Sequence, residues 1–114
     1  MARINYIELP ASAFEAAADF YAKAFGWSLA RFGPSYAATT TGDVDLGLQG
    51  DGGEATAAPL PVIEVADLEA ALAAVMAAGA TICRPIFAYP GGRRFHFVDP
   101  SGNEMAVTKS ETLT

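Results

Sequence analysis

The strongest indication of the fold is an internal repeat, because one order of segments occurs twice along the 114 residues. Residues 3–10 alternate like a strand and lead directly into an amphipathic helix that we expect to end at Gly26. A strand at about 61–66 leads in the same way into a helix that begins after Asp67 and ends at Gly79. Each half therefore opens with a strand and a helix.

Both helices have an apolar face at helical spacing, which we expect to lie in the core. In the first helix, Ser12 is the expected N-cap and Glu15 its capping-box partner. The apolar faces consist of Phe14, Ala17, Ala18, Tyr21 and Phe25 in the first helix, and of Leu68, Leu72, Val75 and Met76 in the second.

Three shorter strand-like runs follow each helix, at 28–32, 36–41 and 44–49 and at 80–84, 93–98 and 104–108. Glycine and aspartate at 41–43 and 99–102 predict hairpin turns, and Gly91-Gly92 predicts a mobile loop. We therefore predict an α+β fold in which two βαβββ modules form a curved, open-barrel sheet with a central cleft. One domain spans 1–114, with module one at about 1–50, a linker at about 50–59 and module two at about 60–109.

Composition narrows the classes of partner. The net charge of −6, with no cluster of Lys and Arg, argues against nucleic acid and favours a neutral or cationic small molecule. Cys83 is the only cysteine, so we expect a buried apolar residue and no internal disulfide. No apolar run is long enough for a membrane span or a signal peptide, and the expected location is the cytoplasm.

Strand alternation predicts which side chains line the cleft. Phe95 and Phe97 belong under the helices, which places the neighbouring residues of their strand on the other face. The expected ligand-binding residues on that face are Tyr6, Glu8, Val62, Glu64, Arg94, His96, Ala106 and Thr108, and Glu104 shares the face with them.

Two of these residues are candidates for acid–base chemistry. His96 is the only histidine and titrates near neutrality, but it also fits a residue that hydrogen-bonds a neighbour across the sheet. Glu8 stands where an apolar residue is ordinary, and it fits a base, an anchor for a cationic group or an ion-pair partner of Arg94. Tyr6, Tyr36, Tyr89, Trp27 and Phe32 offer aromatic walls for a planar ligand.

The paired halves, Tyr21-x-x-x-Phe25-Gly26-Trp27 and Asp99-Pro100-x-Gly102-Asn103 resemble the vicinal oxygen chelate superfamily. This superfamily includes lactoylglutathione lyases, extradiol dioxygenases, and fosfomycin- and bleomycin-resistance proteins. Ile7-Glu8-Leu9-Pro10 and the Pro-Gly-Gly-Arg run before Phe95 look closest to its uncharacterised glyoxalase-related group. The resemblance implies a homodimer, a small-molecule ligand and, in many members, a metal.

The metal ligands of the superfamily carry over to Tyr6, Leu60, Ala106 and a fourth position near Gly47 or Leu48. Leucine and alanine have no lone pair to donate, so we expect no metal at these positions. An alternative site would combine Glu8, His96 and either Glu64 or Glu104. No nucleotide motif occurs either, and we expect no cofactor.

Three functions fit these observations. The first is a metal-free protein that binds a small organic molecule, cationic or aromatic, as bleomycin-resistance proteins do. The second is a lyase or isomerase that uses His96 or Glu8 for proton transfer, with Arg94 stabilising negative charge. The third is a dimerising interaction module with a vestigial cleft.

Overall fold

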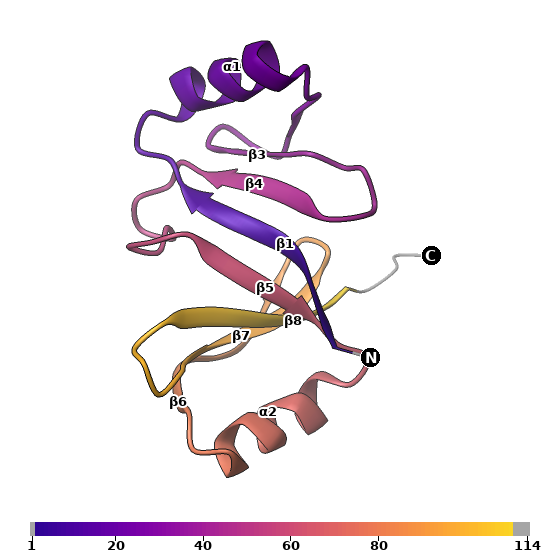
Figure 1. The fold of residues 1–114 in the computed structure, drawn as a ribbon, viewed down its shortest axis with the longest axis vertical. Helices are drawn as coiled ribbons and strands as arrows, with labels where there is room; N and C mark the ends of the chain where they lie inside the picture. The colour runs from indigo at the N-terminus through magenta and orange to yellow at the C-terminus, as the bar shows by residue number, and fades with distance from the viewer. Residues whose placement is uncertain (1, 111–114) are drawn as a thin grey trace. The chain divides into compact units, whose positions relative to one another are not determined.

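The computed structural model, which describes residues 2–110, confirms an α+β fold with two βαβββ units (Figure 1). Module one comprises residues 5–60, and module two comprises residues 61–110 together with residues 2–4. The boundary falls directly before Pro61, so the glycine-rich run at 50–53 belongs to module one. The single domain predicted for residues 1–114 stays a prediction.

Module one contains β1 (Arg3–Pro10, whose first two residues group with module two), α1 (Phe14–Phe25), β2 (Ala30–Arg31), β3 (Tyr36–Ala38) and β4 (Asp45–Gln49). Its strands follow the order β2-β3-β4-β1. β1 and β4 run parallel, whereas the β2–β3 and β3–β4 pairs are antiparallel. The parallel pair is possible because α1 connects β1 back to the rest of the sheet.

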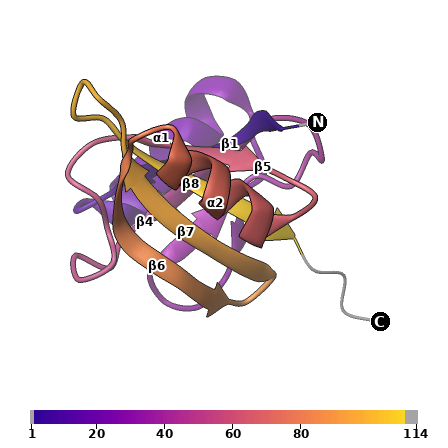
Figure 2. The ribbon, with the colours of Figure 1, turned by 90° about the horizontal axis from the view of Figure 1, so that it is seen from below.

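Module two repeats this plan with β5 (Leu60–Glu64), α2 (Leu68–Ala77), β6 (Thr81–Tyr89), β7 (Gly92–Val98) and β8 (Glu104–Ser110). Its strand order is β5-β8-β7-β6, with β5 and β8 parallel and the other pairs antiparallel. Figure 2 shows α2 lying across the strands of its own module. The repeat predicted from the sequence is therefore confirmed in both halves.

The C-terminal end of α1 is as predicted, but its N-terminal end is not. Gly26 adopts a left-handed conformation, φ 70°, and its N–H donates to the Ala22 carbonyl. Ala13 is the N-cap and makes no side-chain capping bond, so the predicted Ser12–Glu15 capping box is wrong. Glu15 instead forms an ion pair with Arg31 at 3.0 Å, a partner that is distant in sequence.

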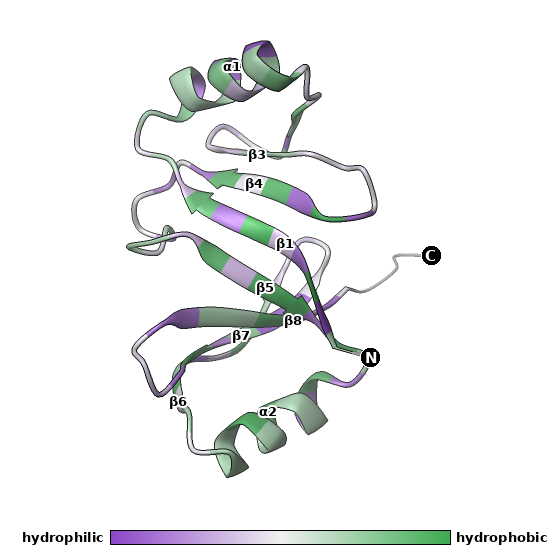
Figure 3. Cartoon of the chain, in the orientation of Figure 1, coloured by the Kyte–Doolittle hydropathy of each residue, from purple (hydrophilic) through white to green (hydrophobic). Residues whose placement is uncertain are grey.

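In α2, the predicted N-cap is confirmed, because Asp67 accepts a hydrogen bond from the Ala70 N–H at 3.0 Å. Gly79 follows the helix with φ 100°, where a side chain would be strained. Figure 3 shows α2 as apolar along most of its length, whereas β1 alternates. Met76, predicted in the core, is 58% exposed, because the largely apolar helix buries only one of its faces.

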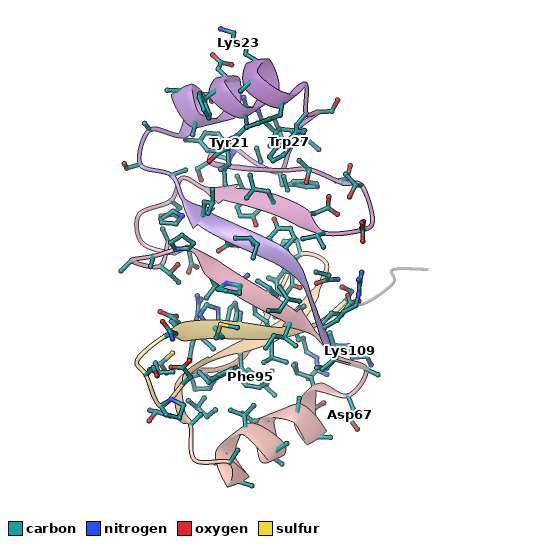
Figure 4. All side chains as sticks on the ribbon, viewed as in Figure 1. Tyr21, Lys23, Trp27, Asp67, Phe95 and Lys109 are labelled. Atoms are coloured by element: carbon teal, nitrogen blue, oxygen red, sulfur yellow. The ribbon has the colours of Figure 1, made fainter. Side chains whose placement is uncertain are left out.

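Each module has its own small core beneath its helix. In module one, Ala11, Ala18 and Leu48 are buried together, and Tyr21 stacks on Trp27 with ring centroids 5.7 Å apart (Figure 4). In module two, the core is formed by Leu68, Phe95 and Val107. Phe25 also stacks on Trp27 but is 60% exposed, so its predicted place in the core is wrong.

Two predictions about β6 also fail. Cys83 is exposed, not buried, and it alternates with Ile82 and Arg84 as Thr81 and Pro85 do. Gly92 pairs with Tyr89 and starts β7, so Pro90 and Gly91 form a tight two-residue turn in place of the predicted mobile loop.

The Asp99 hairpin is confirmed. The Asp99 side chain accepts hydrogen bonds from the Ser101 and Asn103 N–H groups, and its carbonyl accepts one from Gly102. In residues 2–110, neither helix has the length and apolar character that crossing a membrane requires.

Candidate functional site

The candidate site in module two is the sheet face that points away from α2. Cross-strand pairing places Val62, Ala106, His96 and Arg84 in one row, and Glu64, Thr108, Arg94 and Phe87 in the next. Directly opposed residues share a face, and the alternate residues Ile63, Phe95 and Val107 pack with Leu68 of α2. We call these two rows, together with Glu104 and Tyr89, the His96 face.

His96 is the most deeply buried polar side chain on this face, with 1% of its surface exposed. Its Nδ1 atom lies 2.7 Å from Oε2 of Glu104, whose side chain is 38% exposed. Within residues 2–110, Nε2 of the same ring has no hydrogen-bond partner. Because a carboxylate only accepts, Nδ1 carries the proton and Nε2 offers a lone pair.

The surroundings of His96 favour its neutral form. Burial lowers the pKa of His96 below its ordinary value, and the positive charges of Arg94 and Arg84 lower it further. The hydrogen bond to Glu104 acts in the opposite direction but does not cancel the effect of burial. At neutral pH the Nε2 lone pair is therefore available to accept a hydrogen bond or a proton.

Two arginines contact the same aromatic ring beside His96. The Arg84 guanidinium carbon lies 3.7 Å from the centre of the Phe87 ring, and that of Arg94 lies 5.3 Å from it. Arg94 is also 5.4 Å from the ring centre of Tyr89. The Phe87 and His96 ring centroids are 5.8 Å apart, so cationic, aromatic and imidazole groups converge here.

Hydroxyl and thiol groups complete the His96 face. The Tyr89 hydroxyl pairs with Oγ1 of Thr108 at 2.5 Å, and Thr108 also donates to the Arg93 carbonyl at 3.1 Å. Burial raises the pKa of the Cys83 thiol, and the charge of Glu104 together with a hydrogen bond to it raises the pKa further. The thiol is therefore protonated at neutral pH and is not an activated nucleophile.

Module one carries the other two predicted site residues, Tyr6 and Glu8. Glu8 is 3% exposed, and its Oε2 accepts a hydrogen bond from the Tyr36 hydroxyl at 2.8 Å. The Tyr36 hydroxyl also pairs with that of Tyr6 at 2.5 Å. Burial, followed by the charge of Glu8, raises the pKa of Tyr36 far above its ordinary value, so Tyr36 stays a neutral donor.

The fourth metal position can be tested within module one. Glu8 pairs with Gly47 across β1 and β4, as Val62 pairs with Ala106 across β5 and β8, so Gly47 is the counterpart of Ala106. Leu48 belongs instead to the core beneath α1. A Cβ atom on Gly47 would overlap the hydroxyls of Tyr6 and Tyr36, which occupy the space of a side chain there.

These residues do not fit the metal that the resemblance implies. Leu60 and Ala106 are fully buried hydrocarbon side chains, and Gly47 offers no donor atom. Across residues 2–110, no three His, Cys, Asp or Glu side chains gather in a way that could hold a metal ion. Leu60, Ala106 and Gly47 lack the nitrogen, oxygen or sulfur atoms that the usual metal centre of the superfamily needs.

Module one also has a pocket of about 580 Å³ on the α1 side of its sheet. Its apolar wall includes Ile7, Trp27, Val44 and Leu46, and its polar wall includes Asp45. Hydrogen bonds from Thr39, Thr41 and Gly42 engage both Asp45 oxygens. Burial opposes these bonds, but together they lower the pKa of Asp45.

The structure groups the predicted residues by module. Val62, Glu64, Arg94, His96, Ala106 and Thr108 share one face of module two, whereas Tyr6 and Glu8 belong to module one. Arg84 and Phe87 were not predicted, because the irregular register of β6 hides them from a simple alternation. The module-one pocket was not predicted. Of its lining residues, the sequence analysis named only Trp27 as an aromatic wall for a ligand.

The comparisons with known proteins agree with this fold. No curated protein matches the chain. Among solved structures, a Mn(II)-bound glyoxalase from Novosphingobium aromaticivorans is 20% identical, with a TM-score of 0.70. The match covers 100% of this chain and 44% of that one.

Two further structures are similar over almost their full lengths. Methylmalonyl-CoA epimerase from Mycobacterium tuberculosis is 13% identical with a TM-score of 0.75, covering 96% of this chain and 88% of that one. A glyoxalase/bleomycin resistance protein/dioxygenase superfamily member from Vibrio splendidus 12B01 is 16% identical with a TM-score of 0.67, covering 96% and 100%. At such identities, the likeness establishes the fold alone. The glyoxalase/bleomycin resistance protein/dioxygenase family model matches residues 3–107, and the chain therefore belongs to that superfamily.

Proposed function

We propose that this protein binds a small organic molecule on the His96 face, without a metal ion at the usual positions of the superfamily. The observation that carries the proposal is the His96 ring, which is 1% exposed and held at Nδ1 by Glu104. Its Nε2 atom has no hydrogen-bond partner within residues 2–110. Leaving a buried polar atom without a partner costs about 1–3 kcal/mol, and a ligand that donates to Nε2 removes that cost.

The surrounding residues supply the other features of a small-molecule site. Phe87 and Tyr89 provide flat apolar surface, while Arg84 and Arg94 provide hydrogen-bond donors. These four side chains are partly exposed, whereas Val62 and Ala106 in the neighbouring strands are buried. A ligand would therefore contact the face from the β6–β7 side. The cationic ligand expected from the net charge stays a prediction.

The structural neighbours support only the general class. Their names describe a Mn(II)-bound glyoxalase and a methylmalonyl-CoA epimerase. The metal of the first cannot be carried over, because Leu60, Ala106 and Gly47 supply no ligand atoms here.

A second function, proton transfer by a lyase or isomerase, is favoured by the His96–Glu104 pair. Neutral Nε2 would take a proton from a carbon next to a carbonyl, and the electron pair of that C–H bond would move onto the carbonyl oxygen. Arg94 would stabilise the resulting enolate, and return of the proton from Nε2 would complete the cycle. Glu8, buried and bonded to Tyr36, is the alternative base.

Ligand binding can be tested by nuclear magnetic resonance, because the chain has one histidine and one tryptophan. With any affinity tag removed, a fragment library should contain compounds that shift the His96 imidazole signals. His96→Asn should weaken this binding, because asparagine can still donate to Glu104 but lacks an atom at the position of Nε2. Equal binding to His96→Asn and to the unchanged protein would contradict the proposal.

The enzymatic candidate has its own test. Carbonyl compounds that bind should exchange their α-hydrogens for deuterium in D₂O, and the exchange should stop in His96→Asn or in Glu8→Gln. Exchange that persists in both variants would leave the mechanism without a base.

The homodimer implied by the superfamily resemblance also stays a prediction. Sedimentation of the intact chain should give twice the monomer mass of 11.8 kDa. A monomer at concentrations of about 100 μM, a level at which specific dimers are normally formed, would contradict it.

A further inference from the structure

We propose that the module-one pocket is a second binding site, which takes a small organic cation with an apolar body and a charged N–H group. The residues that line this pocket of about 580 Å³ all belong to module one, and none of them is part of the His96 face. Pockets of about 300–1,000 Å³ commonly bind small molecules. The inference stands apart from the function proposed for His96 and does not rest on it.

Asp45 supplies the negative charge of the pocket. Its Oδ1 atom accepts hydrogen bonds from the Thr39 hydroxyl and from the hydroxyl and N–H of Thr41, each at 2.8 Å. Its Oδ2 atom accepts one hydrogen bond, from the Gly42 N–H at 3.0 Å. These bonds close the β3–β4 hairpin and hold the carboxylate in one orientation. Within residues 2–110 no other group donates to Oδ2, so this oxygen can accept one more hydrogen bond, from a ligand.

The carboxylate of Asp45 is ionised, and its charge is not balanced nearby. Burial alone would raise the pKa of Asp45, but the hydrogen bonds from Thr41, Thr39 and Gly42 outweigh it and hold the pKa below its ordinary value. In the part of the chain from residue 2 to residue 110, Asp45 forms no ion pair. A cationic N–H group in the pocket would therefore meet a fixed, charged acceptor.

Trp27 and Val44 supply the apolar surface of the pocket. The indole stacks on Tyr21 and on Phe25, with ring centroids 5.7 and 5.2 Å away, and yet it is 40% exposed (Figure 4). Val44, which lines the same pocket, is 54% exposed. The body of a ligand would remove this apolar surface from water, and tryptophan is the side chain whose ring attracts a cation most strongly. The class of ligand is therefore an arylalkyl or alkyl ammonium that keeps an N–H.

The test uses one benzyl group with three charges: benzylamine, which is protonated at neutral pH, benzyl alcohol and phenylacetate. A fourth probe, benzyltrimethylammonium, keeps the positive charge but has no N–H. The indole N–H signal of Trp27, the only tryptophan, gives the dissociation constants. Benzylamine should bind about fivefold more tightly than benzyl alcohol, and phenylacetate should bind most weakly. Benzyltrimethylammonium should bind more weakly than benzylamine, because it cannot donate to Oδ2.

Variants assign the preference to Asp45. Asp45→Asn should reduce the ratio of the benzyl alcohol to the benzylamine dissociation constant towards one. Asp43→Asn removes the same charge from an exposed side chain of the same hairpin that does not line the pocket, and it should leave the ratio unchanged. If Asp45→Asn does not fold, Val44→Lys replaces it. This change places an ammonium group beside the carboxylate from an exposed position, and it should weaken benzylamine binding more than benzyl alcohol binding.

Each outcome bears on one part of the inference. If benzyl alcohol or phenylacetate binds as tightly as benzylamine, the cationic class is wrong. Equal binding of benzylamine and benzyltrimethylammonium would refute the hydrogen bond to Oδ2. A preference for benzylamine that survives both Asp45→Asn and Val44→Lys would refute the role of Asp45. If no probe shifts the Trp27 signal, the pocket is not a binding site, and the function proposed for the His96 face is unaffected.

Discussion

Nδ1 of His96 lies 2.7 Å from Oε2 of Glu104, so a half-exposed carboxylate on β8 fixes the orientation of a buried imidazole on β7. The two residues are not directly opposite, since His96 pairs with Ala106 and Glu104 pairs with Val98. The contact is therefore diagonal across the two strands. Ala106 lies directly opposite His96 on the same face, and a larger side chain at Ala106 would extend towards the imidazole.

This contact predicts the tautomer of His96. Nitrogen-15 spectra at neutral pH should show a protonated Nδ1 and an unprotonated Nε2, because only Nδ1–H can donate to the carboxylate. Glu104→Ala removes the acceptor and should produce a mixture of tautomers. Protonation of Nε2 in the unchanged protein would contradict the assigned hydrogen bond.

Stability should depend on pH through His96. Burial holds its pKa in the folded protein below the ordinary value of about 6.5, so the unfolded chain binds the proton more readily. The free energy of unfolding should therefore be fully maintained above pH 6.5 and should decrease as the pH falls below that value. Urea unfolding between pH 7.5 and 5.5 measures this, and His96→Asn should flatten the decrease. If His96→Asn keeps the full decrease of the unfolding free energy with falling pH, another titrating group causes that decrease.

Tyr36→Phe should lower the free energy of unfolding by about 1–3 kcal/mol, because the buried Glu8 carboxylate loses its hydroxyl donor. Tyr21→Phe is the matched control. Tyr21 packs through its ring, and its hydroxyl makes no hydrogen bond that the structure describes, so this change should be nearly neutral. Urea unfolding at pH 7 compares the two, and equal losses would contradict a special role for the Tyr36 hydroxyl.

Gly47→Ala should also be destabilising, by about 1–3 kcal/mol, because the new methyl group meets the Tyr6 and Tyr36 hydroxyls. Gly52→Ala adds the same methyl group where no other atom lies within 4 Å, and it should cost little. The comparison uses the same unfolding assay. A harmless Gly47→Ala would mean that the tyrosine pair does not occupy this space.

The sequence was sufficient for the fold because its signals are local. The Asp67 side chain marks the start of one helix, and the left-handed backbone of Gly26 marks the end of the other. Asp99 closes its hairpin by accepting hydrogen bonds from Ser101, Gly102 and Asn103. These interactions need no knowledge of the tertiary structure. The paired modules could be predicted from them.

The candidate site was predictable only where strands are regular. Arg94 and His96 lie on an uninterrupted strand, and alternation alone places them on one face. Arg84 and Phe87 share that face only because β6 shifts register between them. Such shifts depend on contacts with β7, which the sequence of β6 alone does not reveal.

The most direct test of the account is the nitrogen-15 shift of His96 Nε2, measured while the tightest-binding uncharged fragment is added. The indole N–H of Trp27, the only tryptophan, reports on the separate pocket of module one in the same sample. The account predicts that Nε2 shifts in a saturable way, with a dissociation constant that rises in His96→Asn when measured by ligand signals. If that uncharged fragment saturates the Trp27 signal while Nε2 stays unchanged, its binding site lies in the other module, which contradicts the account.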